Sequence, residues 1–295
     1  MFAVVGTIPD SGFPLLAGKV TLEKDEICIE NNRVPAKRGT AALLAAAIKV
    51  GEVLGQEEPF GYLVGDIGRG EGSQQLYKYL AKHLSQTDFH IVAFHYIQPL
   101  IGWHNRILSV IEKMKKRPIL VADAGYMYVA KMSGKSDAYD LFTPDVGELA
   151  FLADETAPHP FYTRGFILHE ENHVPDLISQ AYAHNNAARY LLVKGRQDYI
   201  ASQKGILSIV DDPLEEVMEA IGGTGDTLTG IVAALIASGL DIREAAITGS
   251  KVNRLAGSYA HPTPATQVIE IIRCIPEALK ILMKEDQWKT IKHPD

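Results

Sequence analysis

The chain has 295 residues, 46% of them hydrophobic, so it can form a substantial core, and we expect a single domain over residues 1–295. The formal net charge of −7 argues against a nucleic-acid or membrane partner, and a small-molecule substrate is expected instead. The two cysteines, Cys28 and Cys274, cannot form a disulfide framework, and the apolar runs are too short to span a membrane, which favours a cytoplasmic protein.

Short apolar runs alternate with helical patterns along most of the chain, which is typical of βαβ units and a mostly parallel sheet. The predicted strands are residues 2–6, 62–64, 91–94, 119–122, 141–143, 190–193 and 206–210. The predicted helices are residues 40–54, 73–84, 103–115, 146–152, 176–185, 225–238 and 241–259. Pro276 is predicted to end one C-terminal helix and to begin the next. Several strands are apolar without alternation, as expected for strands buried on both faces.

One segment interrupts this order. Residues 19–34 place Val20, Leu22, Ile27 and Ile29 around a charged turn, which predicts a β-hairpin. Such a hairpin either projects over a binding site or is a plain edge feature, and the sequence leaves both interpretations open.

The stretch Gly222-Gly223-Thr224-Gly225-Asp226 stands directly before a long apolar helical run. Glycine permits positive φ and close approach of the backbone to a ligand, and the first N–H groups of a helix point at an anion. Asp226 beside such a cradle could take a proton from a hydroxyl that attacks phosphorus. The alternative is a tight turn in which Asp226 only caps the helix.

Two other motifs carry less information. The loop at residues 65–73 has glycines at the wrong intervals for a dinucleotide fingerprint, so it either touches a ligand or only reverses the chain, with Ser73 as the expected helix cap. His169 and His173 have the spacing of a zinc protease, but Pro175 follows at once and leaves little room for the helix that this motif needs.

Polar residues also follow three predicted strands, at the edge where open α/β sheets bind ligands. Glu148 could approach a magnesium ion bound to phosphate, or it could simply cap a helix. Lys194 or Arg196 could meet phosphate oxygens, and Asp123 lies at the end of another strand.

These motifs together resemble the ribokinase-like superfamily. The branch most similar to this chain contains the carbohydrate-kinase-like NAD(P)H-hydrate dehydratases, with hydroxyethylthiazole and hydroxymethylpyrimidine kinases nearby. The resemblance covers residues 91–257 best. It rests on GGTGDTLTGI at residues 222–231, TPDVGE at 143–148 and VKG at 193–195.

The resemblance implies a three-layer α/β/α sandwich with a mostly parallel central sheet, and a site that binds ATP or ADP together with Mg. It also implies a role for each matching position, and a homo-oligomer is expected on the same ground. The implied residues are Asp226 as catalytic base with Gly223, Thr224 and Gly225 in the anion hole; Lys194, Gly195, Gly222, Thr143 and Asn253 around the nucleotide; Gly39, Thr40 and Asp123 on the substrate side; and Glu148 near the metal.

Two segments differ from the dehydratase pattern. The chain has EVME at residues 216–219 where those relatives have an Asn-Pro-Gly-Met type of segment, and HYIQPL at 95–100 where they have a glycine-rich turn. We therefore expect a kinase that phosphorylates a hydroxyl of a small metabolite, of sugar or vitamin-precursor type. An ADP- or ATP-dependent NAD(P)H-hydrate dehydratase is the first alternative, and a catalytically silent nucleotide sensor is the second.

Overall fold

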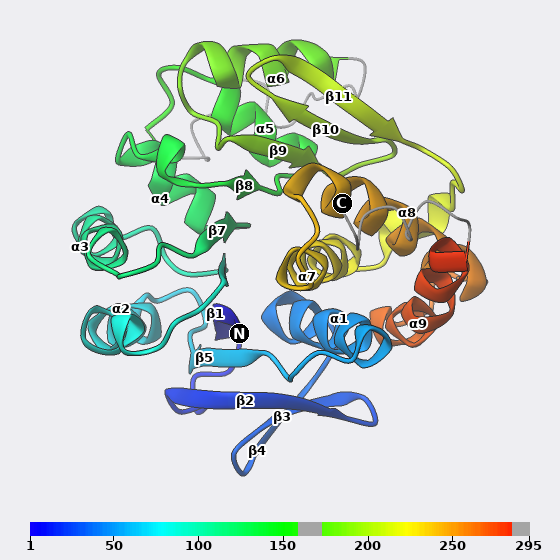
Figure 1. Ribbon diagram of the computed structural model, residues 1–295, viewed down its shortest axis with the longest axis horizontal. Helices are drawn as coiled ribbons and strands as arrows, with labels where there is room; N and C mark the ends of the chain where they lie inside the picture. The colour runs from blue at the N-terminus through cyan, green and yellow to red at the C-terminus, as the bar shows by residue number, and fades with distance from the viewer. Residues whose placement is uncertain (159–172, 285–295) are drawn as a thin grey trace, which may run out of the picture. The chain divides into compact units, whose positions relative to one another are not determined.

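A computed structural model describes residues 1–158 and 173–284 (Figure 1). It divides into two compact units, one formed by Met1–Gly18 with Phe60–Ile209 and the other by Lys19–Pro59 with Val210–Asp295. The expectation of a single domain stays a prediction. His169, with its zinc-protease spacing, lies outside the described residues.

The first unit contains most of the strands, in the spatial order β11-β10-β9-β8-β7-β6-β1-β5. The five neighbouring pairs from β9 to β5 are parallel, and β10 pairs with β9 in the antiparallel sense. The strands are β1 (Phe2–Ile8), β5 (Phe60–Gly65), β6 (Ile91–His95), β7 (Ile119–Ala122), β8 (Leu141–Phe142), β9 (Tyr190–Val193), β10 (Asp198–Ser202) and β11 (Gly205–Val210). The predicted mixed α/β fold with a mostly parallel sheet is confirmed.

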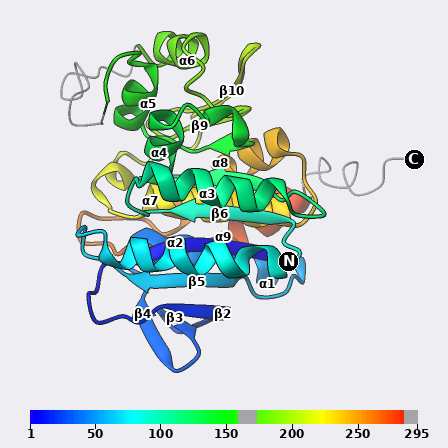
Figure 2. The same ribbon diagram turned by 90° about the vertical axis from the view of Figure 1, so that its left-hand side faces the viewer.

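Helices flank this sheet, and Figure 2 shows α2 and α3 side by side in front of β5 and β6. The helices of the first unit are α2 (Glu71–His83), α3 (Ile101–Glu112), α4 (Tyr126–Met132), α5 (Val146–Ala153) and α6 (Val174–Ala183). Because parallel strands linked by helices all end at the same edge, the loops after β1, β5, β6, β7, β8 and β9 share one edge of the sheet.

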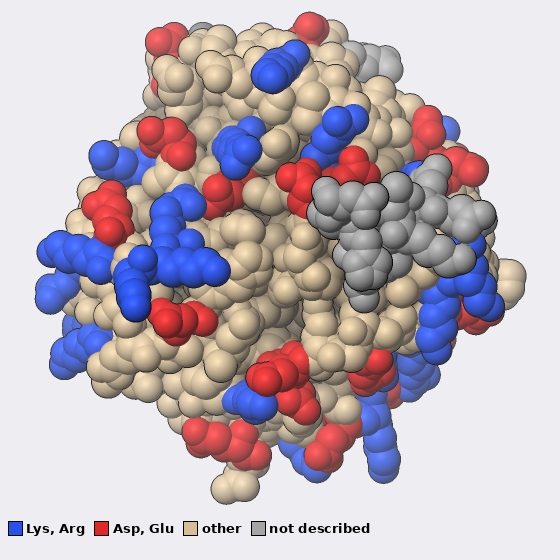
Figure 3. Space-filling view, in the orientation of Figure 1, with Lys and Arg blue, Asp and Glu red and all other residues tan. Residues whose placement is uncertain are grey.

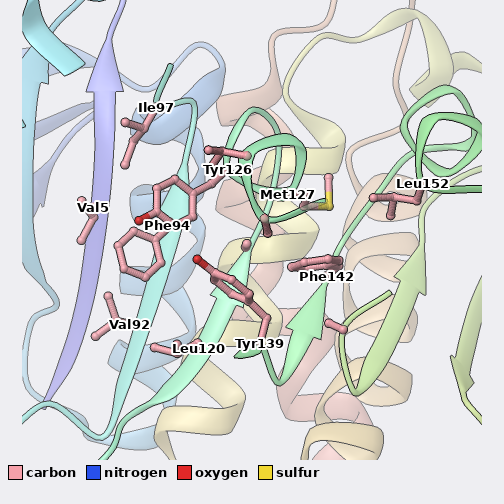
Figure 4. Close-up of a cluster of buried hydrophobic side chains, with 14 of the residues drawn as sticks. Val5, Val92, Phe94, Ile97, Leu120, Tyr126, Met127, Tyr139, Phe142 and Leu152 are labelled. Atoms are coloured by element: carbon pink, nitrogen blue, oxygen red, sulfur yellow. The ribbon is translucent and has the colours of Figure 1, made fainter. Parts of the chain in front are cut away.

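The core of the first unit fills the space between sheet and helices (Figure 4). Val5, Val92 and Leu120 reach it from three adjacent strands, and the ring of Tyr126 stacks on Phe94 with centroids 4.2 Å apart. Burying these apolar side chains stabilises the unit by roughly 1.5–3 kcal/mol each. This burial explains why the strands read as continuous apolar runs.

The second unit holds an antiparallel strand group and a helical group. The chain enters it within β2 (Leu16–Glu23), which pairs with β3 (Glu26–Ile29), and β3 pairs in turn with β4 (Asn32–Pro35). Helix α7 packs on α1 and α8, while α9 packs on α1 and α8 as well. The helical elements are α1 (Gly39–Leu54), the 3₁₀ turn η5 (Glu216–Ala220), α7 (Thr224–Ala237), α8 (Ile242–Tyr259) and α9 (Val268–Lys284).

The predicted hairpin within residues 19–34 is present, since Val20 pairs with Ile29 and Leu22 with Ile27, and a second turn at Glu30 adds β4 to it. The prediction for the C-terminal helices is wrong. Pro276 does not separate two helices but lies inside α9. The helix continues through it because the buried stripe around Ile272, Ile275 and Leu279 outweighs the loss of one hydrogen bond.

The start of α2 also differs from the prediction. Ser73 is not the cap; the helix begins at Glu71, and Ser73 lies in its first turn. The capping oxygen comes from Asp66, which accepts hydrogen bonds from both the amide and the hydroxyl of Ser73 at 2.8 Å. The strand β10 and the short helix α4 are elements that the sequence pattern did not indicate.

The surface carries charges of both signs. On the face drawn in Figure 3, basic side chains gather towards the left, and acidic side chains lie among and beside them. Within residues 1–158 and 173–284, no helix combines the length and apolarity needed to cross a bilayer. The absence of nucleic-acid and membrane partners stays a prediction.

Candidate active site

The glycine-rich loop forms the N-terminus of α7. Gly223 is the residue before the helix and has φ +103°, a conformation that favours glycine. A Cβ atom on Gly223 would lie 3.2 Å from Cα of Arg38 and 3.3 Å from the carbonyl oxygen of Lys37. A Cβ atom on Gly222 would meet nothing within 4 Å, so the loop is packed on one side and open on the other. The first amides of α7 lie at a helix N-terminus, a place that suits an anion, and the predicted anion site stays a prediction.

Asp226 lies in the first turn of α7, three residues after Gly223, and does not cap that helix. Its Oδ2 atom instead accepts a hydrogen bond from the amide of Gly39 at 2.6 Å. Gly39 is the first residue of α1, so the carboxylate lies at the start of two helices at once. The structure thus brings together Asp226 and Gly39, two predicted site residues that are 187 positions apart.

Close packing of α1 against α7 keeps these two helix starts together. A Cβ atom on Gly230 would lie 2.1 Å from the carbonyl oxygen of Leu43, so only glycine allows the two backbones to approach this closely. Gly230 lies one helical turn after Asp226, and Leu43 lies one turn after Gly39. The tight contact therefore fixes the position of the carboxylate.

Asn253 connects α8 to the same loop. Its Oδ1 atom accepts a hydrogen bond from the Thr227 hydroxyl at 2.8 Å, and its amide donates to the carbonyl oxygen of Thr224 at 3.4 Å. Asn253 and Thr40 are both buried. These contacts give Asn253 a role in holding the loop, while its predicted contact with a nucleotide stays a prediction.

In the first unit, the other predicted residues meet at the carboxyl ends of the parallel strands. Lys194, after β9, places Nζ at 2.9 and 3.0 Å from the two oxygens of Asp123, after β7. The Asp123 side chain is 1% exposed, and His95 at the end of β6 has its Nε2 atom 3.8 Å from Oδ2 of Asp123. Thr143 is also buried, after β8, and the amide of Gly195 donates to Asp198 at 3.2 Å. This edge therefore carries a buried ion pair with a histidine beside it.

Glu148 shares this edge. It forms a capping box with Asp145: the Glu148 amide donates to Oδ1 of Asp145, and the Asp145 amide donates to Oε2 of Glu148. Its Oε1 atom accepts from the Tyr128 hydroxyl at 2.8 Å. Burial raises the pKa of the Glu148 carboxyl well above its usual value, and the nearby Asp145 and Asp123 carboxylates raise it further against the lowering effect of Lys194.

These contacts bear on the predicted metal role of Glu148. Both of its oxygens accept hydrogen bonds within the protein, one of them as part of the capping box. Glu148 therefore fits the helix-cap interpretation, while its predicted place near a magnesium ion stays a prediction.

The second glycine-rich loop is occupied by its own carboxylate. Asp66 accepts hydrogen bonds from the amides of Gly68 and Gly70 at 2.9 and 3.0 Å, in addition to those from Ser73. Donors that could hold an external anion thus bind Asp66. This favours the interpretation in which the loop only reverses the chain.

A mostly parallel sheet and a glycine-rich turn at the start of α7 are the features of a carbohydrate-kinase-like α/β protein. Residues 101–276 match the family model described as NAD(P)H-hydrate dehydratase, and the chain belongs to this family. The resemblance stated from the sequence is confirmed.

Two relatives illustrate how the similarity is distributed. An uncharacterized protein of Methanocaldococcus jannaschii is 42% identical over 243 residues, which are 82% of this chain and 100% of that protein. The bifunctional NAD(P)H-hydrate repair enzyme of Pyrobaculum aerophilum is 29% identical over 195 residues, 64% of this chain but 35% of the enzyme. The chain thus matches about one third of the length of that bifunctional relative.

Solved structures are similar in fold. Phosphofructokinase-2 of Escherichia coli with fructose-6-phosphate has a TM-score of 0.55 and 13% identity, covering 95% of this chain and 99% of that one. Pyridoxal kinase of Staphylococcus aureus with ADP has a TM-score of 0.51 and 11% identity, covering 87% of each chain. The ribokinase-like fold predicted from the sequence is therefore confirmed.

Two residues of the site were not found from the sequence. His95, which shows no ligand spacing in the sequence, is fully buried beside Asp123. Tyr128 lies in the unpredicted helix α4 and binds Glu148. The position of His95 at the carboxyl end of a parallel strand was the signal that could have indicated it.

Proposed function

We propose that this protein is a nucleotide-dependent NAD(P)H-hydrate dehydratase. The observation that carries the proposal is the family match over residues 101–276, which includes the anion site at the start of α7 and Asp226. Similarity to the hydrate repair enzyme of Pyrobaculum aerophilum supports the same reaction. This favours the alternative over the kinase activity that we expected first.

The residues of the second unit can perform the first half of this reaction. Asp226 takes the proton from the ring hydroxyl as its oxygen attacks the terminal phosphorus of ATP or ADP, and the shortened nucleotide leaves. The amides of the Gly223–Gly225 turn stabilise negative charge on the transferred group. The Gly39 amide holds the carboxylate in one orientation throughout.

The second half restores the dihydropyridine ring. The carbon–oxygen bond breaks, and phosphate leaves with the electron pair of that bond. A proton is lost from the neighbouring ring carbon, and its former bonding pair forms the new carbon–carbon double bond. The products are NAD(P)H, inorganic phosphate and the shortened nucleotide. Magnesium enters the proposal only as the ordinary counter-ion of nucleotide phosphates.

A direct assay tests the proposal. The protein is incubated with hydrated NADH and either ATP or ADP, and recovery of NADH absorbance is followed together with release of phosphate. We expect both signals to rise in equal amounts and to require the nucleotide. If absorbance does not recover with either nucleotide, the protein is not a hydrate dehydratase.

A kinase for a small hydroxyl-bearing metabolite is the second candidate. The unusual segments at residues 95–100 and 216–219 favour it, because they differ from the dehydratase pattern. A panel of sugars and hydroxymethyl-bearing vitamin precursors with ATP would then give a stable phosphorylated product. A sensor without activity would instead show a nucleotide-dependent rise in melting temperature and no turnover with any acceptor.

A further inference from the structure

The loop that follows β6 holds an exposed tyrosine in an unusual conformation. Tyr96 has φ +52°, in the left-handed region that bulky residues rarely adopt. Its side chain remains 48% exposed. Among the described residues, Lys24, Glu30, Asn185 and His261 also combine a side chain with positive φ, but Tyr96 alone of these five is an exposed large apolar residue.

Surrounding hydrogen bonds impose this conformation. The Tyr96 amide donates to the carbonyl oxygen of Ala124 at 2.8 Å, and its carbonyl accepts from the Thr7 hydroxyl at 2.6 Å. Gly125 lies so close that an added Cβ atom would be 2.9 Å from the carbonyl oxygen of Ile97. The end of β1 and the loop after β7 therefore hold the backbone of Tyr96 from two directions.

The rest of the loop is held as firmly. The Gln98 amide donates to the Ser73 hydroxyl at 3.1 Å, and the Gln98 carbonyl accepts from the Tyr77 hydroxyl at 3.1 Å. A strained backbone costs about 1–3 kcal/mol and persists where the surroundings determine it, often at ligand-binding positions. The Tyr96 ring is thus presented on a rigid support at the ligand-binding edge of the sheet.

Tyr96 also lies next to the buried charged residues of that edge. Its ring packs edge-on against His95 with centroids 4.4 Å apart, and His95 lies 3.8 Å from Asp123. A molecule bound near Asp123 would therefore meet the exposed part of an aromatic ring. Aromatic side chains bind planar heterocycles by stacking, whereas a simple sugar phosphate offers no planar ring.

We propose that Tyr96 is a specificity-determining residue that stacks on a planar heterocyclic ring of a nucleotide acceptor. This inference deepens the proposed function, on which it rests, because it names a residue that binds a ring of the dinucleotide acceptor.

Binding of unhydrated NADH, measured by calorimetry, tests this inference separately from turnover. Saturating ADP is present throughout to fill the site for the phosphoryl donor. The measured NADH binding then refers to the acceptor site. Tyr96→Asn removes the aromatic ring while keeping a residue that tolerates positive φ, and Tyr96→Phe keeps the ring. Ile206→Asn removes another exposed large apolar side chain, from β11, as a matched control.

We expect Tyr96→Asn to weaken NADH binding by about 5- to 150-fold, the range for loss of one stacked base. Tyr96→Phe and Ile206→Asn should bind NADH as the wild type does, and all three variants should retain the wild-type affinity for ADP. Equal NADH affinity in the wild type and Tyr96→Asn would overturn the inference, as would a wild type that does not bind NADH. If the protein dehydrates hydrated NADH but the Tyr96→Asn variant binds NADH as well as the wild type, only this inference is refuted. If NADH binding depends on Tyr96 but no dehydration occurs, only the proposed reaction is refuted.

Discussion

The ammonium group of Lys194 lies between the two carboxylate oxygens of Asp123, at 2.9 and 3.0 Å. These residues follow β9 and β7, which are separated by β8 in the sheet, so the ion pair links two strands that are not neighbours at their carboxyl ends. The two side chains are 11% and 1% exposed, and the pair is therefore little screened by solvent.

Lys194→Met should destabilise the protein strongly, because it removes the ammonium partner of a buried carboxylate. We expect a loss of about 3–5 kcal/mol in the free energy of unfolding, measured by urea denaturation. The double variant Asp123→Asn/Lys194→Met removes both charges and should recover part of this loss. If the double variant loses as much stability as Asp123→Asn and Lys194→Met lose together when made separately, the two charges do not stabilise each other.

Gly230→Ala should separate α1 from α7, since the new methyl group would meet the Leu43 carbonyl at 2.1 Å. We expect a loss of about 1–3 kcal/mol in stability, with a fall in turnover because Gly39 and Asp226 move apart. Gly102→Ala in α3 is the matched control, because nothing lies within 4 Å of the added atom. This control should instead stabilise the protein by up to about 1 kcal/mol, and equal effects of the two changes would contradict the packing argument.

Much of the fold could be predicted because its signals are local. The strands at residues 119–122 and 190–193 have the predicted bounds, since an uninterrupted apolar run marks a strand that is buried on both faces. Most helix bounds were within two residues of the prediction. A strong local signal failed at Pro276, where packing of the buried α9 stripe outweighed the preference of proline for helix ends.

Contacts between distant parts of the chain could not be predicted in the same way. Asp66 replaces Ser73 as the helix cap from seven positions away, and nothing in the local pattern distinguishes the two. The resemblance placed Asp226 and Gly39 in one site, but the hydrogen bond between them depends on the fit of α1 against α7. The same holds for His95, whose burial beside Asp123 follows from the order of the strands.

His104 should make the stability of the protein sensitive to acid. It is fully buried, with its Nε2 atom 2.8 Å from the Tyr139 hydroxyl and its Nδ1 atom 3.1 Å from the Ser133 hydroxyl. Burial lowers its pKa to about 4 from an ordinary value of 6.5. Because the unfolded chain binds the proton first, the contribution of His104 is complete above pH 6.5 and is lost as the pH falls to about 4.

The expected size of this loss is up to about 3 kcal/mol, and urea denaturation at a series of pH values measures it. His104→Gln keeps a polar side chain that does not titrate, so its stability should fall less steeply between pH 6.5 and 4. Parallel curves for the variant and the wild type would show that His104 does not take up its proton preferentially in the unfolded chain.

Asp226 combines a structural contact with a proposed chemical role, and two substitutions separate them. Asp226→Asn keeps an oxygen that can accept the hydrogen bond from Gly39 but cannot act as a base. Asp226→Ala removes both properties. We expect turnover to fall by about 10²- to 10⁴-fold in both variants, the usual effect of losing a general base.

Thermal unfolding should distinguish the same two variants. Asp226→Asn should unfold close to the wild-type temperature, whereas Asp226→Ala should lose about 1 kcal/mol because the Gly39 amide no longer has that acceptor. Full turnover by Asp226→Asn would exclude a catalytic role for the carboxylate. Turnover lost only in Asp226→Ala would leave Asp226 as a residue that positions the start of α1, because the Gly39 contact alone would then account for the effect.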